Sequence, residues 1–220
     1  MKSAVIIMAK VPRAGNVKTR LQPFLTPERA TDFAACLMCD TIEKVKNLKN
    51  QLVIAYSPRN EREFFNRFSL SETLFVEQKG SDLGEKMFNT FAFAFGQNAD
   101  SAVMIGTDSP TFPGEFIEEA FTYLETFDAV LGKTSDGGFY LIGLRRLRVE
   151  IFENVEWSSP RTFKQTKENI ERAGLKLKEM PEWYDVDEPA DLEKLREDFA
   201  QNEISRLTAP KTFEWLGANL

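Results

Sequence analysis

Histidine is absent from the 220-residue sequence. Its absence excludes Ser-His-Asp and Cys-His mechanisms, imidazole bases and metal sites with histidine ligands. Any acid–base or metal chemistry must therefore come from Asp, Glu, Lys, Tyr or water.

Cysteine occurs only twice, as Cys36 and Cys39, and both fall within a helical pattern. A structural zinc site would need further ligands, such as a second C-x-x-C pair, which this sequence lacks. We expect both thiols to be buried as small apolar side chains; a redox-active C-x-x-C pair is the less favoured alternative.

Long apolar runs are also missing. No stretch approaches the ~20 residues of a membrane-spanning helix, and the apolar residues 4–9 are too few for a signal peptide. We therefore expect a cytoplasmic protein without a membrane partner. The net charge of −6 argues against nucleic acid as a partner, since such binding depends on Lys and Arg displacing phosphate counterions. It does not exclude a local cationic pocket.

The rest of the composition, 42% hydrophobic and 28% charged, is typical of a globular protein, and the length suits one large domain. Short apolar runs alternate with longer helical patterns, which predicts an α/β fold with a mainly parallel sheet covered by helices on both faces. The predicted strands are residues 4–8, 51–56, 73–76, 102–105 and 129–131, with 139–143 and 175–178 less certain in direction.

Proline marks the starts of most predicted helices. Thr26 is a suitable N-cap with Pro27 in the first turn, and later helices are predicted at 113–125, 160–173 and 189–199. The aromatic helix that carries Phe91 is expected to pack in the core. We predict a domain over residues 1–200 and a helical tail over 201–220, which could cover the protein's own surface or a second subunit of a homodimer.

A cationic loop, residues 10–21, directly follows the first predicted strand. It is neither a Walker A loop nor a Rossmann G-x-G-x-x-G. Polar loops at the carboxyl ends of parallel strands commonly bind ligands in α/β proteins. Gly15 allows close backbone approach, while Lys18 and Arg20 can neutralise phosphate oxygens. A solvated basic loop is the alternative.

Three further loops carry acidic residues. Asp108 follows the fourth predicted strand and is a suitable ligand for Mg²⁺ or Mn²⁺, although an Asp there can also form a turn. Asp136, beside Gly137, could bind a sugar, ribose or acceptor hydroxyl, or stabilise its own turn. Asp187 could cap the next helix, or act as a second metal ligand if the fold brings it beside Asp108.

These loops form an ordered set of motifs: K-x-P-x-x-G-x-x-K-T-R-L, D-L-G-E-K-M, G-T-D-S-P, D-G-G-F-Y-L-I-G-L and D-V-D-E-P-A-D-L. Over about residues 4–200, the set resembles the nucleotide-diphospho-sugar transferase superfamily with the GT-A fold. It is most similar to a small bacterial glycosyltransferase-like branch near the molybdopterin and phospholactate nucleotidyltransferases. The resemblance implies a Rossmann-like, three-layer αβα sandwich with a mainly parallel, mixed sheet.

The resemblance also implies roles for individual residues. The phosphate loop corresponds to Gly15, Lys18, Thr19 and Arg20, and the base- or substrate-contacting segment to Asp82, Gly84 and Lys86. Asp108 and Asp187 match the two acids that bind Mg²⁺ or Mn²⁺, and Lys18, Arg20 and Asp108 the catalytic set. Asp136 and Gly137 match the acceptor side.

One departure from the family pattern bears on which group the enzyme transfers. Glycosyltransferases of this fold usually carry D-x-D at the first metal position, whereas Ser109 and Pro110 follow Asp108 here. This favours nucleotidyl transfer from a nucleoside triphosphate to a small acceptor. Glycosyl transfer from a sugar nucleotide is the first alternative, and a nucleotide-binding protein without turnover is the second.

Overall fold

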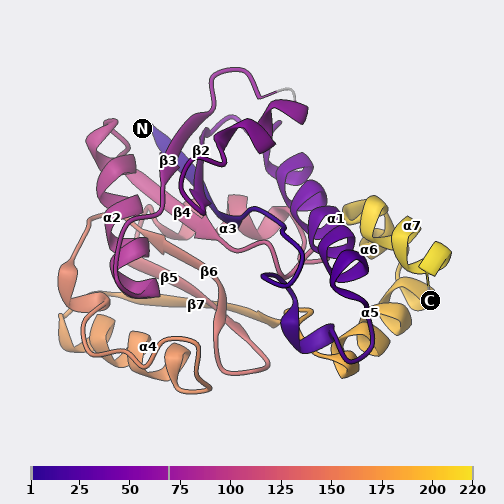
Figure 1. Ribbon diagram of the computed structural model, residues 1–220. Coiled ribbons are helices and arrows are strands. Elements are labelled where there is room, and N and C mark those ends of the chain that lie inside the picture. Colours follow the sequence, from indigo (N-terminus) through magenta and orange to yellow (C-terminus); the bar gives the residue numbers. More distant parts are fainter. Residues whose placement is uncertain (1, 69, 220) are drawn as a thin grey trace.

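The computed structural model describes residues 2–68 and 70–219. Seven strands form one mixed sheet in the order β3-β2-β1-β4-β6-β5-β7, and helices lie on both of its faces (Figure 1). The strands are β1 (Ser3–Lys10), β2 (Gln51–Ser57), β3 (Leu74–Glu77), β4 (Ser101–Ile105), β5 (Ala129–Thr134), β6 (Phe139–Leu144) and β7 (Leu177–Trp183). The predicted α/β class is confirmed.

Among the described strands, β6 is antiparallel to both of its neighbours, β4 and β5, while the other pairs are parallel. The short connection from β5 to β6, residues 135–138, explains this direction, because parallel strands need a longer crossover. Because β1 and β4 are parallel neighbours, their carboxyl ends lie side by side at one edge of the sheet.

The helices are α1 (Pro27–Val45), α2 (Leu83–Gly96), α3 (Glu115–Tyr123), α4 (Thr162–Arg172), α5 (Pro189–Gln201), α6 (Glu203–Thr208) and α7 (Pro210–Asn219). Short 3₁₀ helices span Thr19–Leu21, Arg62–Arg67 and Val149–Ile151. Thr26 caps α1 by accepting a hydrogen bond from the Arg29 backbone N–H, as predicted. The expected starts at Pro113 and Pro160 were wrong, because each proline lies in the loop before its helix.

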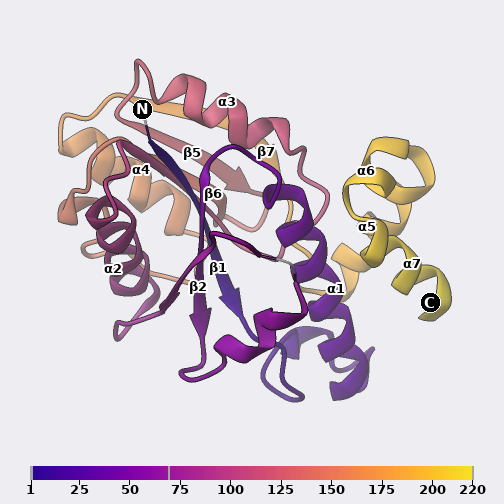
Figure 2. The same ribbon diagram turned by 90° about the horizontal axis from the view of Figure 1, so that it is seen from above.

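Helices α1 and α3 lie on one face of the sheet, and α2 and α4 lie on the other (Figure 2). Alternate residues of each strand point to opposite faces, so two cores result. Val5 and Ile7 pack with α1 and α3 on one face, whereas Ala4 and Ile6 pack with α2 and α4 on the other. Phe91 of α2 is fully buried in the second core, which confirms its expected packing role.

The last two helices pack against the chain's own surface, beside α1 and α5 (Figure 1). Buried Asp40 of α1 accepts hydrogen bonds from the backbone N–H groups of Lys211, at 3.1 Å, and Thr212, at 2.8 Å, and so caps α7. Phe33, Phe199 and Leu216 share the apolar cluster between these helices. The division at residue 200 and the homodimer both stay predictions.

Across the described ranges, none of the helices combines the length and apolar character that a membrane crossing requires.

Candidate phosphate and metal site

The cationic loop and two of the predicted acids meet at the carboxyl edge of the sheet. Lys18 Nζ donates hydrogen bonds to Asp108 Oδ1, to the Val186 carbonyl oxygen at 2.8 Å and to Asp187 Oδ1 at 2.9 Å. The Val186 backbone N–H in turn donates to the Asp108 carbonyl oxygen at 2.9 Å. Residues that lie far apart in the sequence therefore form one cluster.

Lys18 is the buried member of this cluster. Its side chain is 4% exposed, whereas those of Asp108 and Asp187 are 47% and 40% exposed. Lys18 also adopts a left-handed backbone conformation with φ 46°, which a residue with a Cβ adopts at some cost in energy. Such strain is found most often at functional positions, where the surrounding structure holds it in place.

The charges of the two acids determine the ionisation of Lys18. Burial by itself lowers the pKa of an ammonium group, but the charges and hydrogen bonds of Asp108 and Asp187 outweigh burial and raise the pKa of Lys18. Lys18 is therefore a permanent cation between two solvent-facing carboxylates.

The rest of the cationic loop surrounds Lys18. Gly15 has φ +79°, a conformation that favours glycine. Arg20 is an exposed side chain that pairs with Glu188, with Nη1 at 3.5 Å from Oε1. A pair this exposed is weak, so the guanidinium of Arg20 is available to an anion at low cost.

A cavity of about 970 Å³ opens beside the cluster, which is large enough for a nucleotide and part of an acceptor. Seven of the predicted site residues line it: Lys18, Thr19, Arg20, Lys86, Asp108, Asp136 and Asp187. The other four, Gly15, Asp82, Gly84 and Gly137, do not line it and have structural roles nearby.

Asp82 and Gly84 shape the start of α2. Asp82 Oδ1 accepts a hydrogen bond from the Glu85 backbone N–H at 2.8 Å and caps the helix. A Cβ on Gly84 would lie 2.4 Å from the indole nitrogen of Trp157, so glycine permits that ring to pack there. Direct contact of these two residues with a base or substrate stays a prediction.

The β5–β6 turn forms the predicted acceptor side. Asp136 Oδ1 accepts hydrogen bonds from Thr134 Oγ1, at 2.6 Å, and from the Gly138 backbone N–H, at 2.9 Å, and so stabilises the turn while still lining the cavity. Gly137 has φ +92°, and a Cβ there would lie 2.2 Å from the Pro160 carbonyl oxygen. Glycine therefore lets the segment 157–160 close one wall of the cavity.

Asp108 and Asp187 are the residues that fit a divalent cation. Among the described residues, no group of three or more His, Cys, Asp and Glu side chains is arranged to hold a metal ion. The Oδ1 atoms of both acids nevertheless converge on one positive charge, the Lys18 ammonium. Mg²⁺ commonly binds to one or two carboxylates together with water and substrate phosphates, so this pair of acids fits it.

Asp185 is a residue of this site to which the sequence assigned no role. It accepts a hydrogen bond from Ser109 Oγ and lines the cavity. Burial, together with the charge of Asp108, raises the pKa of Asp185 to about 7. Asp185 lies in the same quoted motif as Asp187, but the sequence cannot show which acid of the run is buried.

The two cysteines are free thiols on α1, and each is only partly buried, so the expectation that both are buried was wrong. Burial and the nearby charge of Asp40 raise the pKa of Cys36 to about 11, and burial also raises the pKa of Cys39. Both thiols are therefore protonated at neutral pH, which disfavours the redox alternative.

The sequence matches a family model over residues 41–159, described as "Uncharacterized protein conserved in bacteria (DUF2064)". The chain belongs to the DUF2064 family. The match includes Asp108 and Asp136 but not the cationic loop or Asp187. Among curated proteins, none matches this DUF2064 chain.

Solved structures extend the comparison to the whole chain. A protein from Desulfovibrio desulfuricans G20, named a putative nucleotide-diphospho-sugar transferase, is 30% identical with a TM-score of 0.91, and the match covers 100% of this chain and 96% of that one. This match confirms the resemblance to the nucleotide-diphospho-sugar transferases and the sandwich fold that it implies.

Two more distant structures share the fold alone. CMP:2-keto-3-deoxy-manno-octonic acid synthetase complexed with CTP is 13% identical with a TM-score of 0.58, covering 91% of this chain and 99% of that one. Rv0371c from Mycobacterium tuberculosis H37Rv, in a complex with manganese, is 14% identical with a TM-score of 0.56, covering 90% and 99%.

Proposed function

We propose that this DUF2064 protein is a transferase that uses an activated nucleotide, and that it transfers a nucleotidyl group from a nucleoside triphosphate to a small acceptor. The observation that supports this most is the meeting of Lys18 with Asp108 and Asp187 at the edge of a large cavity. A buried cation beside exposed carboxylates suits the binding of phosphates together with a divalent metal.

In this reaction, an oxygen of an acceptor phosphate or carboxylate forms a bond to the α-phosphorus while the bond from that phosphorus to its bridging oxygen breaks. Pyrophosphate leaves with the electron pair. Lys18, after exchanging one of its three present acceptors for a phosphate oxygen, and Arg20 hold the leaving phosphates and stabilise their growing negative charge. Thr19 and Lys86 line the same cavity. Such transfer depends on positioning and electrostatics, so the absence of histidine is no handicap.

Asp108 and Asp187 would hold the Mg²⁺ or Mn²⁺ ion. When bound, the ion supplies positive charge to the phosphate oxygens. The manganese complex of Rv0371c supports a divalent metal in this fold, and the CTP complex of the synthetase supports a nucleoside triphosphate as substrate.

We place the acceptor between the β5–β6 turn and the segment 157–160. Asp136 uses Oδ1 for its turn, which leaves its second carboxylate oxygen for an acceptor hydroxyl. Gly137 contributes because, without a Cβ, it lets Pro160 approach from the opposite wall of the cavity. We also propose a cytoplasmic location for the protein.

Glycosyl transfer from a sugar nucleotide is the second candidate, and the name of the Desulfovibrio protein favours it. In that case Lys18 and Arg20 would hold the diphosphate of the donor. The lack of a D-x-D pair at Asp108 favours the nucleotidyl reaction instead.

The released product distinguishes the two reactions. Purified protein with Mg²⁺ is incubated with nucleoside triphosphates or sugar nucleotides and a panel of small acceptors. Pyrophosphate release supports nucleotidyl transfer, and nucleoside diphosphate release supports glycosyl transfer. Metal-dependent binding with neither product over hours would instead indicate a nucleotide-binding protein without turnover.

A further inference from the structure

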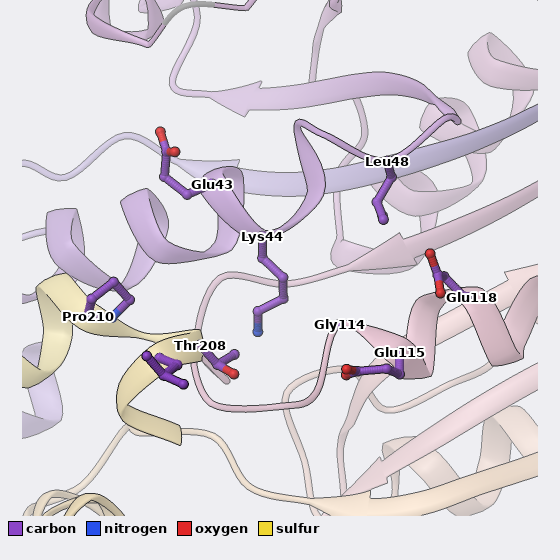
Figure 3. Close-up of a pocket in the computed structure, with 9 residues that line it drawn as sticks. Glu43, Lys44, Leu48, Gly114, Glu115, Glu118, Thr208 and Pro210 are labelled. Atoms are coloured by element: carbon purple, nitrogen blue, oxygen red, sulfur yellow. The ribbon is translucent and has the colours of Figure 1, made fainter. Parts of the chain in front are cut away.

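Lys44, near the end of α1, projects its side chain toward the segment that follows Asp108 (Figure 3). Its Nζ donates hydrogen bonds to the carbonyl oxygens of Pro110, at 2.8 Å, and Phe112, at 2.7 Å. The ammonium also lies 3.8 Å from the centre of the Phe112 ring. One side chain thus contacts both ends of the segment 110–112.

The segment 108–112 is buried apart from its first residue, Asp108. Ser109, Thr111 and Phe112 are all buried, whereas the Asp108 side chain is exposed to the large cavity. Two buried carbonyl groups in such a segment need donors, because an unsatisfied buried carbonyl is costly. Lys44 supplies those donors from another element of the fold.

We infer that Lys44 is a positioning residue of the proposed transferase centre, which holds the segment 108–112 so that Asp108 faces Lys18 and Asp187. This inference rests on the proposed function, since the benefit to Asp108 is the binding of a metal–phosphate complex. Lys44 itself lines a separate cavity of about 370 Å³. It does not contact Asp108, and it does not line the large cavity that Asp108 faces.

The surroundings of Lys44 contain several charges and few polar partners. Glu43 lies on the same helix, Glu115 and Glu118 on α3, and Leu207 and Pro210 complete the cavity from the C-terminal helices. Burial, opposed by the charges of Asp40 and Glu115, lowers the pKa of Lys44 to about 7. A neutral amine still has two N–H groups for the two carbonyls, so the contact persists in either protonation state.

The test compares Lys44→Met with the wild type and with Lys49→Met, which removes an exposed lysine from the loop after the same helix. Isothermal titration measures the affinity for pyrophosphate with and without Mn²⁺. We expect Lys44→Met to weaken the Mn²⁺-dependent part of the pyrophosphate affinity by about 10- to 100-fold, as is typical when support for a metal ligand is removed. Lys49→Met should bind like the wild type.

Two further measurements separate positioning from general stability. In the metal-free protein, hydrogen exchange should accelerate in a peptide covering 105–114 in Lys44→Met, while exchange in β1 stays unchanged. Lys44→Arg should restore part of the Mn²⁺ effect, because its guanidinium has several donors and the adjoining cavity can admit its larger head.

If the methionine variant does not fold, Lys44→Gln replaces it, with the same loss expected because its shorter amide cannot reach both carbonyls. If the folded variant binds pyrophosphate with the same Mn²⁺ dependence as the wild type, the inference is overturned. The proposed function then still stands, because the wild type responds to Mn²⁺. No Mn²⁺ effect in the wild type would overturn the proposed function and, with it, this inference.

Discussion

Lys18 and Lys44 contact the same segment, 108–112, from different cavities, and their pKa values shift in opposite directions. Both ammonium groups lose water on folding. Lys18 faces two carboxylates, which raise its pKa, whereas Lys44 faces two carbonyls and an aromatic ring, and burial lowers its pKa to about 7. Burial lowers the pKa of a lysine, and only partners as strongly charged and as close as Asp108 and Asp187 reverse that shift.

The opposite pKa shifts also indicate that Lys18 and Lys44 have different tasks. A lysine that stays charged beside exposed acids suits the binding of phosphate, whereas a lysine held by carbonyls suits the support of a loop. Replacing each group on its own should therefore give distinct results.

The largest effect is expected for Asp108→Asn. The amide keeps the shape of the side chain but removes the charge that Lys18 and a metal ion would share, so turnover should fall by about 100- to 1,000-fold. Product release measures the loss, and Asp32→Asn on the exposed surface of α1 is the control. Full activity in Asp108→Asn would refute its assigned role.

Lys18→Ala should weaken phosphate binding by about 1.5–3 kcal/mol, the range for a hydrogen bond to a charged group. Titration with pyrophosphate and Mn²⁺ measures this change in binding free energy. Lys164→Ala, which removes an exposed lysine of α4, should bind normally. Unchanged affinity in Lys18→Ala would move the phosphate site elsewhere.

The smallest change, taken per pH unit, is expected in the stability against pH, and it tests the difference between the two lysines most sharply. The folded pKa of Lys44 lies below the usual lysine value, so between about pH 7 and 10 the unfolded chain binds a proton that the folded protein lacks. The wild type should therefore gain stability relative to Lys44→Met as pH rises, by at most about 1.4 kcal/mol per pH unit.

Lys18 should behave in the opposite way. Its folded pKa lies above the unfolded value, so its contribution is fully present below about pH 10 and is lost as pH rises further. The free energy of unfolding of wild type relative to Lys18→Met should thus be constant from pH 7 to 10. Denaturant unfolding at several pH values measures both differences, and parallel curves for the two variants would contradict the comparison.

Much of the fold could be predicted from the sequence because it depends on local patterns. The strands occur close to the predicted positions, and Asp108 follows β4 as its place after an apolar run implied. The direction of β6 was also within reach, given the short turn that contains Asp136. The exact starts of α3 and α4 were not, because a proline can precede a helix as well as begin it.

The parts that escaped prediction depend on long-range packing. The role of Lys44 requires α1 to lie beside residues 110–112, and the burial of Asp185 requires Ser109 to lie beside it. The requirement for glycine at position 84 is likewise visible only in the folded structure, where Trp157 packs over Gly84. No spacing in the sequence shows these contacts.

The central claim is that one cleft holds both the phosphate and the metal, and anomalous diffraction tests it most directly. Crystals of the wild type are soaked with Mn²⁺ and pyrophosphate, which stands for the leaving group whatever the base. We expect a manganese peak at the carboxylates of Asp108 and Asp187, with Lys18 Nζ on a pyrophosphate oxygen. Manganese and pyrophosphate bound away from these residues would contradict it.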